Sequence, residues 1–291
     1  MPSDIIIADH AVIICSANRP DVLADTVAGL RRQTVQPGEI IVSVSKREDA
    51  PQGLWHERGV RVILARRGSS VQRNCALDVL SPGIRLVTFL DDDIELDPTY
   101  FHEIREFLGA HPEVVLADGR LIRDGGVTRP EALRLLDTEV EPGEGFAYTL
   151  NAIGCNMTVR RRIADLVRFD ERLRLYAWLE DADFTRRCLA HGRCARCAAA
   201  RAVHLAVRVG RVSGKQFGFA QIMNPYYLKN KGQMSFIGLF GRHWGHAIAA
   251  NLWGTLARDR SVDRLGRLKG NLIAFSLVAR GRCEPEYVER L

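Results

Sequence analysis

The sequence predicts an α/β fold with a mostly parallel central sheet, helices on both of its faces, and a helical, basic and aromatic C-terminal appendage. Short apolar runs rich in β-branched residues alternate with helical patterns over about the first 90 residues, as in βαβ units. The chain has 291 residues, 46% of them hydrophobic, which is enough to bury a full core. Beyond about residue 210, glycine, basic and aromatic residues dominate. We therefore expect one domain over residues 1–210 and a second region over 211–291.

The first half of the chain supplies the regular elements. Its four expected strands are residues 11–15, 39–45, 60–65 and 85–90. The first expected helix, 21–33, follows Pro20, which suits a first helical turn, and has Leu23, Val27 and Leu30 on one face. The second expected helix, 69–80, turns Val71, Ala76, Leu77 and Leu80 inward. Alternation of this kind predicts strands that run parallel.

The second half is less regular. A helix over 100–108 and a strand over 114–118 are expected, whereas residues 119–150 are rich in glycine and charge and show no clear pattern. A helix over 179–191 ends before Gly192, and a strand-like run covers 201–205.

Charge is distributed unevenly along the chain. Residues 201–291 hold 15 Lys and Arg against 5 Asp and Glu, whereas the net charge of the whole chain is only +6. A basic tail on a neutral-to-acidic body predicts an anionic partner, and nucleic acid, phospholipid and lipid diphosphate all qualify.

The seven cysteines are odd in number and lack the spacing of a disulfide framework, which favours reduced thiols and a cytoplasmic protein. We expect no signal peptide, because the first ten residues have no basic segment. We expect no transmembrane helix either, since Arg242, His243 and His246 interrupt the most apolar stretch. The inner face of the cell membrane stays open as a peripheral location.

Three consecutive carboxylates, Asp91, Asp92 and Asp93, follow the fourth expected strand. Ligands of open α/β sheets bind outside the carboxyl ends of the strands. Adjacent carboxylates repel one another unless a cation neutralises them, and hard oxygen ligands suit Mg²⁺ or Mn²⁺. The alternative is a solvated acidic turn that leads into a helix cap at Asp97.

A second acidic group begins the helix expected at 179–191. Asp181 is the candidate general base, Glu180 could bind acceptor hydroxyls, and Asp183 could pair with Arg186 or Arg187 one turn later. The alternative is that these acids only complement the helix dipole.

Histidine and cysteine offer two further candidate sites. His204 ends the 201–205 run and becomes a metal ligand only if the fold brings it to the aspartates. Cys194 and Cys197 form a CxxC with Cys188 and His191 nearby, but no second CxxC or pair of histidines completes four zinc ligands at a usual spacing, so we interpret the cysteines as buried thiols.

The chain resembles the family 2 glycosyltransferases, which have the GT-A fold. Five segments carry the resemblance over about residues 11–205. The first, residues 12–45, is similar to the βαβ unit that receives the nucleotide in this family. The next two are RGSSVQRNCALD, which is similar to the stretch before the metal site, and VTFLDDDIELDP, which is similar to the DxD strand. The last two are IGCNMTVRRR, which is similar to the acceptor-side strand, and WLEDADFTRR, which is similar to the catalytic ED helix. Five such segments in order are highly specific.

The resemblance implies roles for matching positions. Asp91 and Asp93 would meet the metal and the donor's ribose–diphosphate, His204 would complete the metal shell, and Asp181 would be the general base. The implied substrate-binding residues are Asn18, Arg19, Pro20, Arg73, Asp91 and Asp92 on the nucleotide side, with Gly154, Asn156, Trp178 and Glu180 on the acceptor side. Many relatives carry an Asp after the second strand that binds uracil, where this chain has residues 43–46, SVSK. Uridine, guanosine and thymidine donors all stay open.

A mechanism follows from these residue types. A sugar hydroxyl needs a carboxylate to accept its proton, and a nucleoside diphosphate leaves readily when its charge is neutralised. The sequence offers one base and no evident carboxylate nucleophile, which predicts a single displacement with inversion. We expect the acceptor to be a glycan or lipid-linked glycan of cell-surface polysaccharide or glycolipid synthesis.

The tail interleaves aromatic and basic residues. Over residues 261–280 the expected apolar face holds Val262, Leu265, Leu268, Leu272, Ile273 and Phe275, with Arg260, Arg264 and Arg267 opposite. Such a helix is typical of an anionic membrane surface, although packing against the protein core is the alternative.

Two other functions compete. A nucleotidyltransferase acting on a sugar phosphate would also use a nucleotide, a metal and paired acids, but residues 15–20 lack the glycine-rich phosphate loop that such enzymes usually carry. A basic nucleic-acid-binding protein could use the aromatic tail for stacking. The acidic body argues against it, so we expect no nucleic-acid partner.

Overall fold

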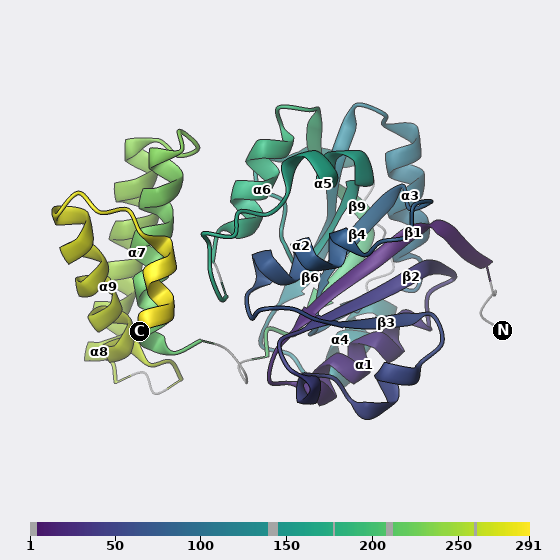
Figure 1. Ribbon diagram of the computed structural model, residues 1–291, viewed down its shortest axis with the longest axis horizontal. Helices are drawn as coiled ribbons and strands as arrows, with labels where there is room; N and C mark the ends of the chain where they lie inside the picture. Colours follow the sequence, from purple (N-terminus) through teal and green to yellow (C-terminus); the bar gives the residue numbers. More distant parts are fainter. Residues whose placement is uncertain (1–4, 139–144, 177, 208–211, 259–260) are drawn as a thin grey trace. The chain divides into compact units, whose positions relative to one another are not determined.

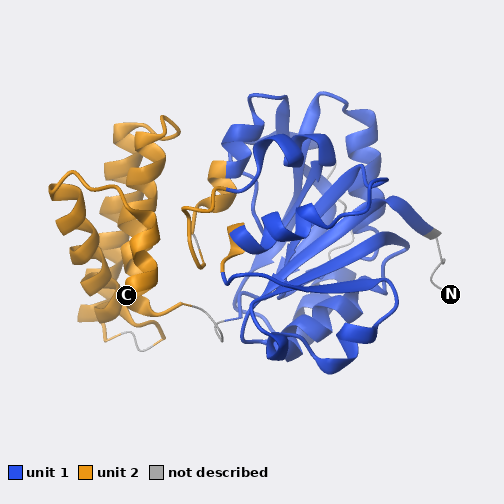
Figure 2. Cartoon of the chain, viewed as in Figure 1, with its two compact units in different colours: residues 1–67, 71–169, 184–210 blue, residues 68–70, 170–183, 211–291 orange. Residues whose placement is uncertain are grey.

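The structure, a computed structural model, describes residues 5–138, 145–176, 178–207, 212–258 and 261–291. The chain forms two compact units (Figure 2). The first comprises residues 1–67, 71–169 and 184–210, and the second comprises 68–70, 170–183 and 211–291. The second unit thus combines the tail with a segment from the middle of the chain. The assignment of separate functions to 1–210 and 211–291 stays a prediction.

Within the described residues, one sheet of nine strands organises the first unit, with strand order β3-β2-β1-β4-β8-β6-β9-β5 and β7 paired to β9. The strands are β1 Ile5–Ser16, β2 Val35–Val44, β3 Val60–Leu64, β4 Leu86–Asp91, β5 Ile94–Leu96, β6 Val114–Asp124, β7 Phe146–Tyr148, β8 Asn156–Arg160 and β9 Arg193–His204. Strands β3, β2, β1 and β4 are all parallel, and β8 joins β4 antiparallel. The α/β fold class is confirmed.

The sheet is buried on both faces because its central strands are apolar at successive positions. In β1, Val12 and Ile14 belong to one core cluster, and Ile13 belongs to another. Helices α1 Pro20–Leu30 and α3 Tyr100–Ala110 pack in the first cluster. Helices α2 Ser69–Asp78, α5 Arg161–Val167 and α6 Glu180–Cys188 contribute to the second (Figure 1).

The seven expected inward positions of α1, α2 and the turn after α2 are all buried. The poorly patterned stretch 119–150 contains the end of β6, helix α4 Arg129–Thr138 and strand β7. The pairing of β6 with β9 shifts register between Gly119 and Arg120. A Cβ at Gly119 would lie 2.4 Å from the Ala200 carbonyl oxygen, so this glycine marks a close backbone contact. Because this irregularity interrupts the alternation of side chains, the sequence pattern predicted only the first five residues of the long strand β6.

The second unit contains α7 Gly214–Asn230, a π-helical turn η3 Gly238–Gly245, α8 His246–Leu256, α9 Arg264–Ala279 and the short helix η4 Pro285–Arg290. Within residues 261–280, the buried positions differ from the apolar face expected on the sequence, whose role at a membrane stays a prediction. Helix α9 buries Gly270, Asn271, Ala274 and Leu277, whereas Leu265 and Leu272 are 60% and 71% exposed. Small residues allow α7 and α9 to approach closely, and Asn271 donates a 2.6 Å hydrogen bond to the Gly218 carbonyl. None of the helices described is both long and apolar enough to cross a membrane.

Candidate active site

The aspartate triplet lies at the carboxyl end of β4, where the register of two strands brings His204 to it. Asp91 ends β4 and pairs with Cys15 at the end of β1. The chain turns at Asp92 and Asp93 into β5, which runs antiparallel to β9 with Ile94 opposite His204. The Leu205 amide also donates a 2.9 Å hydrogen bond to the Asp93 carbonyl. Strand pairing thus places a distant histidine beside two of the aspartates.

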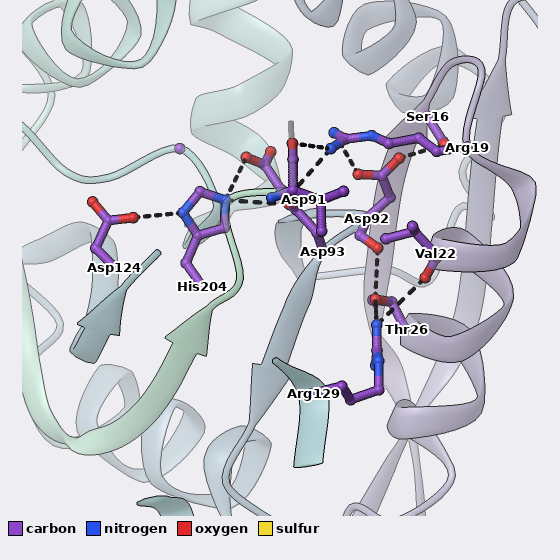
Figure 3. Close-up of polar contacts among 12 residues, drawn as sticks. Ser16, Arg19, Val22, Thr26, Asp91, Asp92, Asp93, Asp124, Arg129 and His204 are labelled. Carbon is purple, nitrogen blue, oxygen red and sulfur yellow. Dashed lines mark hydrogen bonds and ion pairs between the residues drawn. The ribbon is translucent and has the colours of Figure 1, made fainter. Parts of the chain in front are cut away.

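Asp91, Asp93 and His204 form a group that fits a divalent cation. One ligand atom from each lies within 4.8 Å of the others, and within the described residues no other three His, Cys, Asp or Glu side chains meet in this way. His204 Nε2 lies 3.2 Å from Asp93 Oδ1 and 3.9 Å from Asp91 Oδ2. The other ring nitrogen, Nδ1, lies 2.7 Å from Asp124 Oδ1 (Figure 3). When one ring nitrogen of a histidine binds a metal, the other ring nitrogen usually donates a hydrogen bond to a carboxylate, as Nδ1 is placed to do here.

Electrostatics also suits a cation at this position. Burial opposes the charged form of His204, but hydrogen bonds with Asp124 and Asp93 and the nearby carboxylate charges raise its pKa to about 10. A positive charge is therefore stabilised where the carboxylates converge. Two carboxylates and one imidazole are ligands that Mn²⁺ accepts, and carboxylates also suit Mg²⁺.

Asp92 turns away from this group into the protein. It is fully buried, accepts a hydrogen bond from Ser16 Oγ, and pairs with Arg19 at 2.6 Å. Arg19 also lies 3.2 Å from Asp93, so one guanidinium bridges two neighbouring aspartates (Figure 3). Burial raises the pKa of Asp92 to about 7, against the opposing effect of Arg19. The contacts of Asp92 support the loop, and its direct contact with substrate stays a prediction.

A second layer holds the same loop from behind. Thr26 of α1 donates a 2.6 Å hydrogen bond to the Asp92 carbonyl, and Arg129 of α4 donates a 3.1 Å bond to Thr26 Oγ1 (Figure 3). Arg129 also pairs with Glu95, a carboxylate that is 1% exposed. Sequence reasoning missed Arg129, because it lies in the stretch where no element was expected.

Arg73, Gly154 and Asp91 meet on the other side of the triplet. Arg73 of α2 is nearly buried, and its guanidinium lies 3.4 Å from Asp91 Oδ1 and 3.2 Å from the Gly154 carbonyl. It also lies over the ring of Phe169, 5.1 Å from its centroid. The structure therefore brings together three of the predicted site residues. Asn156, by contrast, is fully buried and donates a 3.1 Å bond to the Gly119 carbonyl, so its contact with substrate stays a prediction.

The turn after β1 is joined to the turn after β2 by a residue that the sequence did not single out. Asn18 has φ of +60°, and its amide donates a 2.8 Å hydrogen bond to Asp49 Oδ1. Asp49 is 1% exposed and also accepts a 2.6 Å bond from Ser45 Oγ. Pro20 begins α1 directly afterwards. The available signal was an acidic residue shortly after the second strand.

Helix α6 carries the ED pair and ends at Cys188, three residues before the expected end. Trp178, Glu180 and Asp181 are half-buried and belong to the second unit, whereas Asp91, Asp93 and His204 belong to the first. The role of Asp181 as base therefore stays a prediction. Asp183 forms an ion pair with Lys231, which the sequence did not predict.

The seven cysteines all lie within the described residues and form no disulfide. Burial raises the pKa of Cys194 to about 12, so this thiol stays protonated at neutral pH. This agrees with the interpretation of the CxxC as buried thiols.

Comparison with known proteins places this site in a family. Residues 11–167 match the sequence model of Glycosyl transferase family 2. No curated protein sequence matches the chain. Among solved structures, S. aureus TarS 1–349 in complex with UDP-GlcNAc is 15% identical with a TM-score of 0.53, over 76% of this chain and 67% of that one. The complex of the same protein with UDP is 16% identical with a TM-score of 0.54, over 76% and 66% of the two chains.

GalNAc-T7 with UDP, GalNAc and Mn²⁺ is 13% identical with a TM-score of 0.53, over 80% of this chain and 53% of that one. The chain thus spans about two thirds of the TarS fragment and about half of GalNAc-T7. At these identities the likeness shows a shared fold, GT-A. The family match covers more than half of the sequence and includes the β4 aspartates. The chain belongs to glycosyl transferase family 2.

Proposed function

We propose that this glycosyltransferase is metal-dependent and inverting, and that it transfers a sugar from a nucleotide-diphosphate sugar to an acceptor hydroxyl. The observation that carries the proposal is the convergence of Asp91, Asp93 and His204 at the carboxyl end of β4. Ligands of open α/β sheets bind at this edge. The similar structures that hold UDP, UDP-GlcNAc or Mn²⁺ support a nucleotide sugar as donor and a divalent cation as cofactor.

Asp91, Asp93 and His204 would hold Mg²⁺ or Mn²⁺, which would neutralise the negative charge of the diphosphate. Arg19 and Arg73 place further positive charge beside the triplet, because both guanidinium groups pair with its aspartates. Asn18 and Pro20 shape the turn that would border the nucleotide. Neutralising the diphosphate makes it a better leaving group, and fixed charges do so without reorganisation.

Asp181 would accept the proton of the acceptor hydroxyl, with Glu180, Trp178 and Gly154 on the acceptor side. A single general base, with no second carboxylate in a nucleophilic role, predicts inversion at the anomeric carbon. The donor base is open between uridine, guanosine and thymidine. Uridine is the first to test, because the similar structures hold UDP.

The acceptor would be a glycan or lipid-linked glycan presented at an anionic membrane surface. Several large apolar side chains of the second unit are exposed, namely Phe236, Ile237, Leu252, Trp253 and Leu256. Residues 184–258 contain no Asp or Glu, so no carboxylate of this stretch would repel an anionic surface. Exposed aromatic and aliphatic groups on a stretch of sequence without acidic residues favour interfacial binding at the inner face of the cell membrane.

A panel of nucleotide sugars tests the proposal. Each donor is titrated into the full chain with Mn²⁺ or Mg²⁺ and again with a chelator, and slow hydrolysis of the donor is followed without acceptor. We expect at least one donor to bind and be hydrolysed only with metal. Equal binding with and without chelator would contradict the metal site. Release of pyrophosphate from a nucleoside triphosphate and a sugar phosphate would instead identify a nucleotidyltransferase.

A further inference from the structure

Lys231, the residue that follows α7, joins two carboxylates that lie at opposite ends of one segment. Its Nζ is 2.7 Å from Asp170 Oδ2, and it also forms an ion pair with Asp183 Oδ1. Asp170 and Asp183 are the first and last residues of 170–183, the segment that the second unit takes from the middle of the chain. A single ammonium group therefore contacts both ends of the segment that carries Trp178, Glu180 and Asp181.

Because the side chains of Asp170, Asp183 and Lys231 are mostly buried, water cannot easily take the place of the ammonium group beside the carboxylates. The Asp183 side chain is 0% exposed, and those of Asp170 and Lys231 are 16% and 22% exposed. A carboxylate without access to water is strongly disfavoured unless a cation or hydrogen-bond donors compensate its charge. Burial alone would raise the pKa of Asp170, but hydrogen bonds from Lys231 and Tyr227 lower it below its ordinary value. The ammonium thus serves both carboxylates at once.

The middle of the segment is attached to the same helix. Leu173 is fully buried in a cluster with Tyr227 and Leu228 of α7. Asn224, also of α7 and 3% exposed, donates a 2.9 Å hydrogen bond to the carbonyl of Trp178. Helix α7 and the Lys231 that follows it consequently contact the segment at its start, centre and end.

The backbone directly before the ED pair needs such support. Leu179 has φ of +79°, a left-handed conformation that a leucine rarely adopts. Residues held in this region persist where the surroundings determine their conformation. Leu179 packs against the cluster formed by Leu173, Tyr227 and Leu228, and its carbonyl accepts a 3.0 Å hydrogen bond from the Asp183 amide. The direction of Glu180 and Asp181 thus depends on contacts made at Leu179 and Asp183.

We propose that Lys231 is a positioning residue, which clasps the two ends of segment 170–183 and so fixes the orientation of Glu180 and Asp181. The clasp itself rests on the contacts above, whereas its effect on rate rests on the proposed role of Asp181 as base. The helical unit would then be part of the transfer machinery, in addition to any binding of acceptor or membrane.

Three variants of the full chain test the clasp. Lys231→Met removes the charge and keeps the length of the side chain, and Lys231→Arg keeps the charge. Lys229→Met makes the same chemical change two residues earlier, on α7. We expect kcat of Lys231→Met to fall by about 10- to 100-fold, since displacing a catalytic group by an ångström costs on this order. Donor affinity and metal titration should stay unchanged, Lys231→Arg should recover most of the rate, and Lys229→Met should match the parent.

Hydrogen exchange of the amides of residues 179–183 gives a readout that does not need activity. Exchange should be faster in Lys231→Met than in Lys229→Met, at a temperature where both are fully folded. Equal exchange would overturn the clasp, and faster exchange with an unchanged kcat would overturn the positioning role. If Lys231→Met does not fold, Asp170→Asn opens one end of the clasp while leaving Asp183 paired, and the same comparison decides. A parent that neither transfers nor hydrolyses any nucleotide sugar would refute the proposed function, and the exchange data would still decide the clasp.

Discussion

His204 Nε2 lies 3.2 Å from Oδ1 of Asp93, although 111 residues separate the two along the chain. The contact follows from the antiparallel pairing of β5 with β9. His204 is the last residue of β9, Asp93 directly precedes β5, and the Asp93 carbonyl accepts a hydrogen bond from the Leu205 amide, so the pair is held in place before any ligand binds. Preorganised charge of this kind needs no rearrangement when a substrate arrives.

Asp93→Ala should abolish sugar transfer and remove the metal dependence of donor binding, because it deletes one of the carboxylates proposed to hold the metal. Calorimetric titration of the donor, with and without Mn²⁺, checks this. Asp137→Ala, on the exposed surface of α4, is the control and should behave like the parent. Metal-dependent donor binding in Asp93→Ala would show that Asp93 is not a ligand.

His204→Ala should weaken metal binding while the protein stays folded. Asp124→Asn should weaken it less, by about 10- to 100-fold, because Asp124 acts only through the outer nitrogen of the imidazole. Mn²⁺ titration followed by electron paramagnetic resonance measures both affinities, and circular dichroism measures the fold. Normal titration and normal rate in His204→Ala would return this histidine to a packing role.

Asp181→Asn should lower kcat by roughly 10²- to 10⁴-fold, the usual contribution of a general base, since the amide keeps the shape and loses the basicity. Donor affinity should barely change, because the donor contacts expected here lie on the β4 side of the first unit. Glu180→Gln should instead raise KM for the acceptor more than it lowers kcat. An Asp181→Asn enzyme with most of its maximal rate would show that another group takes the proton.

Acid should destabilise the protein through His10. Burial, and next the charge of Arg105, lower the pKa of this histidine from 6.5 to about 3, and its Nε2 lies 2.7 Å from Thr88 Oγ1. The unfolded chain binds a proton below pH 6.5 that the folded chain refuses until about pH 3, so stability falls as pH drops through this window. At pH 5, the lowered pKa of His10 reduces the free energy of unfolding by about 2 kcal/mol relative to neutral pH.

Urea unfolding at pH 5 and pH 7.5 measures this loss. In His10→Gln, the difference in unfolding free energy between pH 7.5 and pH 5 should be smaller than in the parent by about that amount. The control His56→Gln, at an exposed position, should show the same difference as the parent. An unchanged pH dependence in His10→Gln would show that other groups govern acid unfolding.

Replacing Leu252, Trp253 and Leu256 together by serine should reduce binding to anionic vesicles several-fold, because these exposed side chains supply the apolar contact area. Co-sedimentation at low salt, where surface attraction is least screened, measures the binding. Donor binding should stay as in the parent. If the parent itself ignores anionic vesicles under these conditions, the second unit has no membrane role.

Local sequence patterns were sufficient for the framework of the first unit. The alternation of β-branched runs and helical periods predicted β1 to β4 and helices α1 and α2, since side-chain burial in these elements follows the chain's own period. The position of the triplet at the end of β4 followed from the same pattern. The family resemblance implied that His204 lies beside the aspartates, and the pairing of β5 with β9 supplies the physical reason.

Only the tertiary structure decided the contacts between residues that are distant in the chain. Three features depend on shape complementarity and on hydrogen bonds that the periodicity of the sequence does not predict. They are the turn at Asp49, the contacts of Thr26 and Arg129 with the aspartate loop, and the packing face of α9. Lys231 is the clearest case: its partners Asp170 and Asp183 lie 61 and 48 residues away. Charge and burial determine such pairs, and both become defined only when the chain has folded. The sequence by itself therefore determined the family and the edge of the sheet where the aspartate triplet lies, and the tertiary structure decided which distant residues contact the segment that carries Glu180 and Asp181.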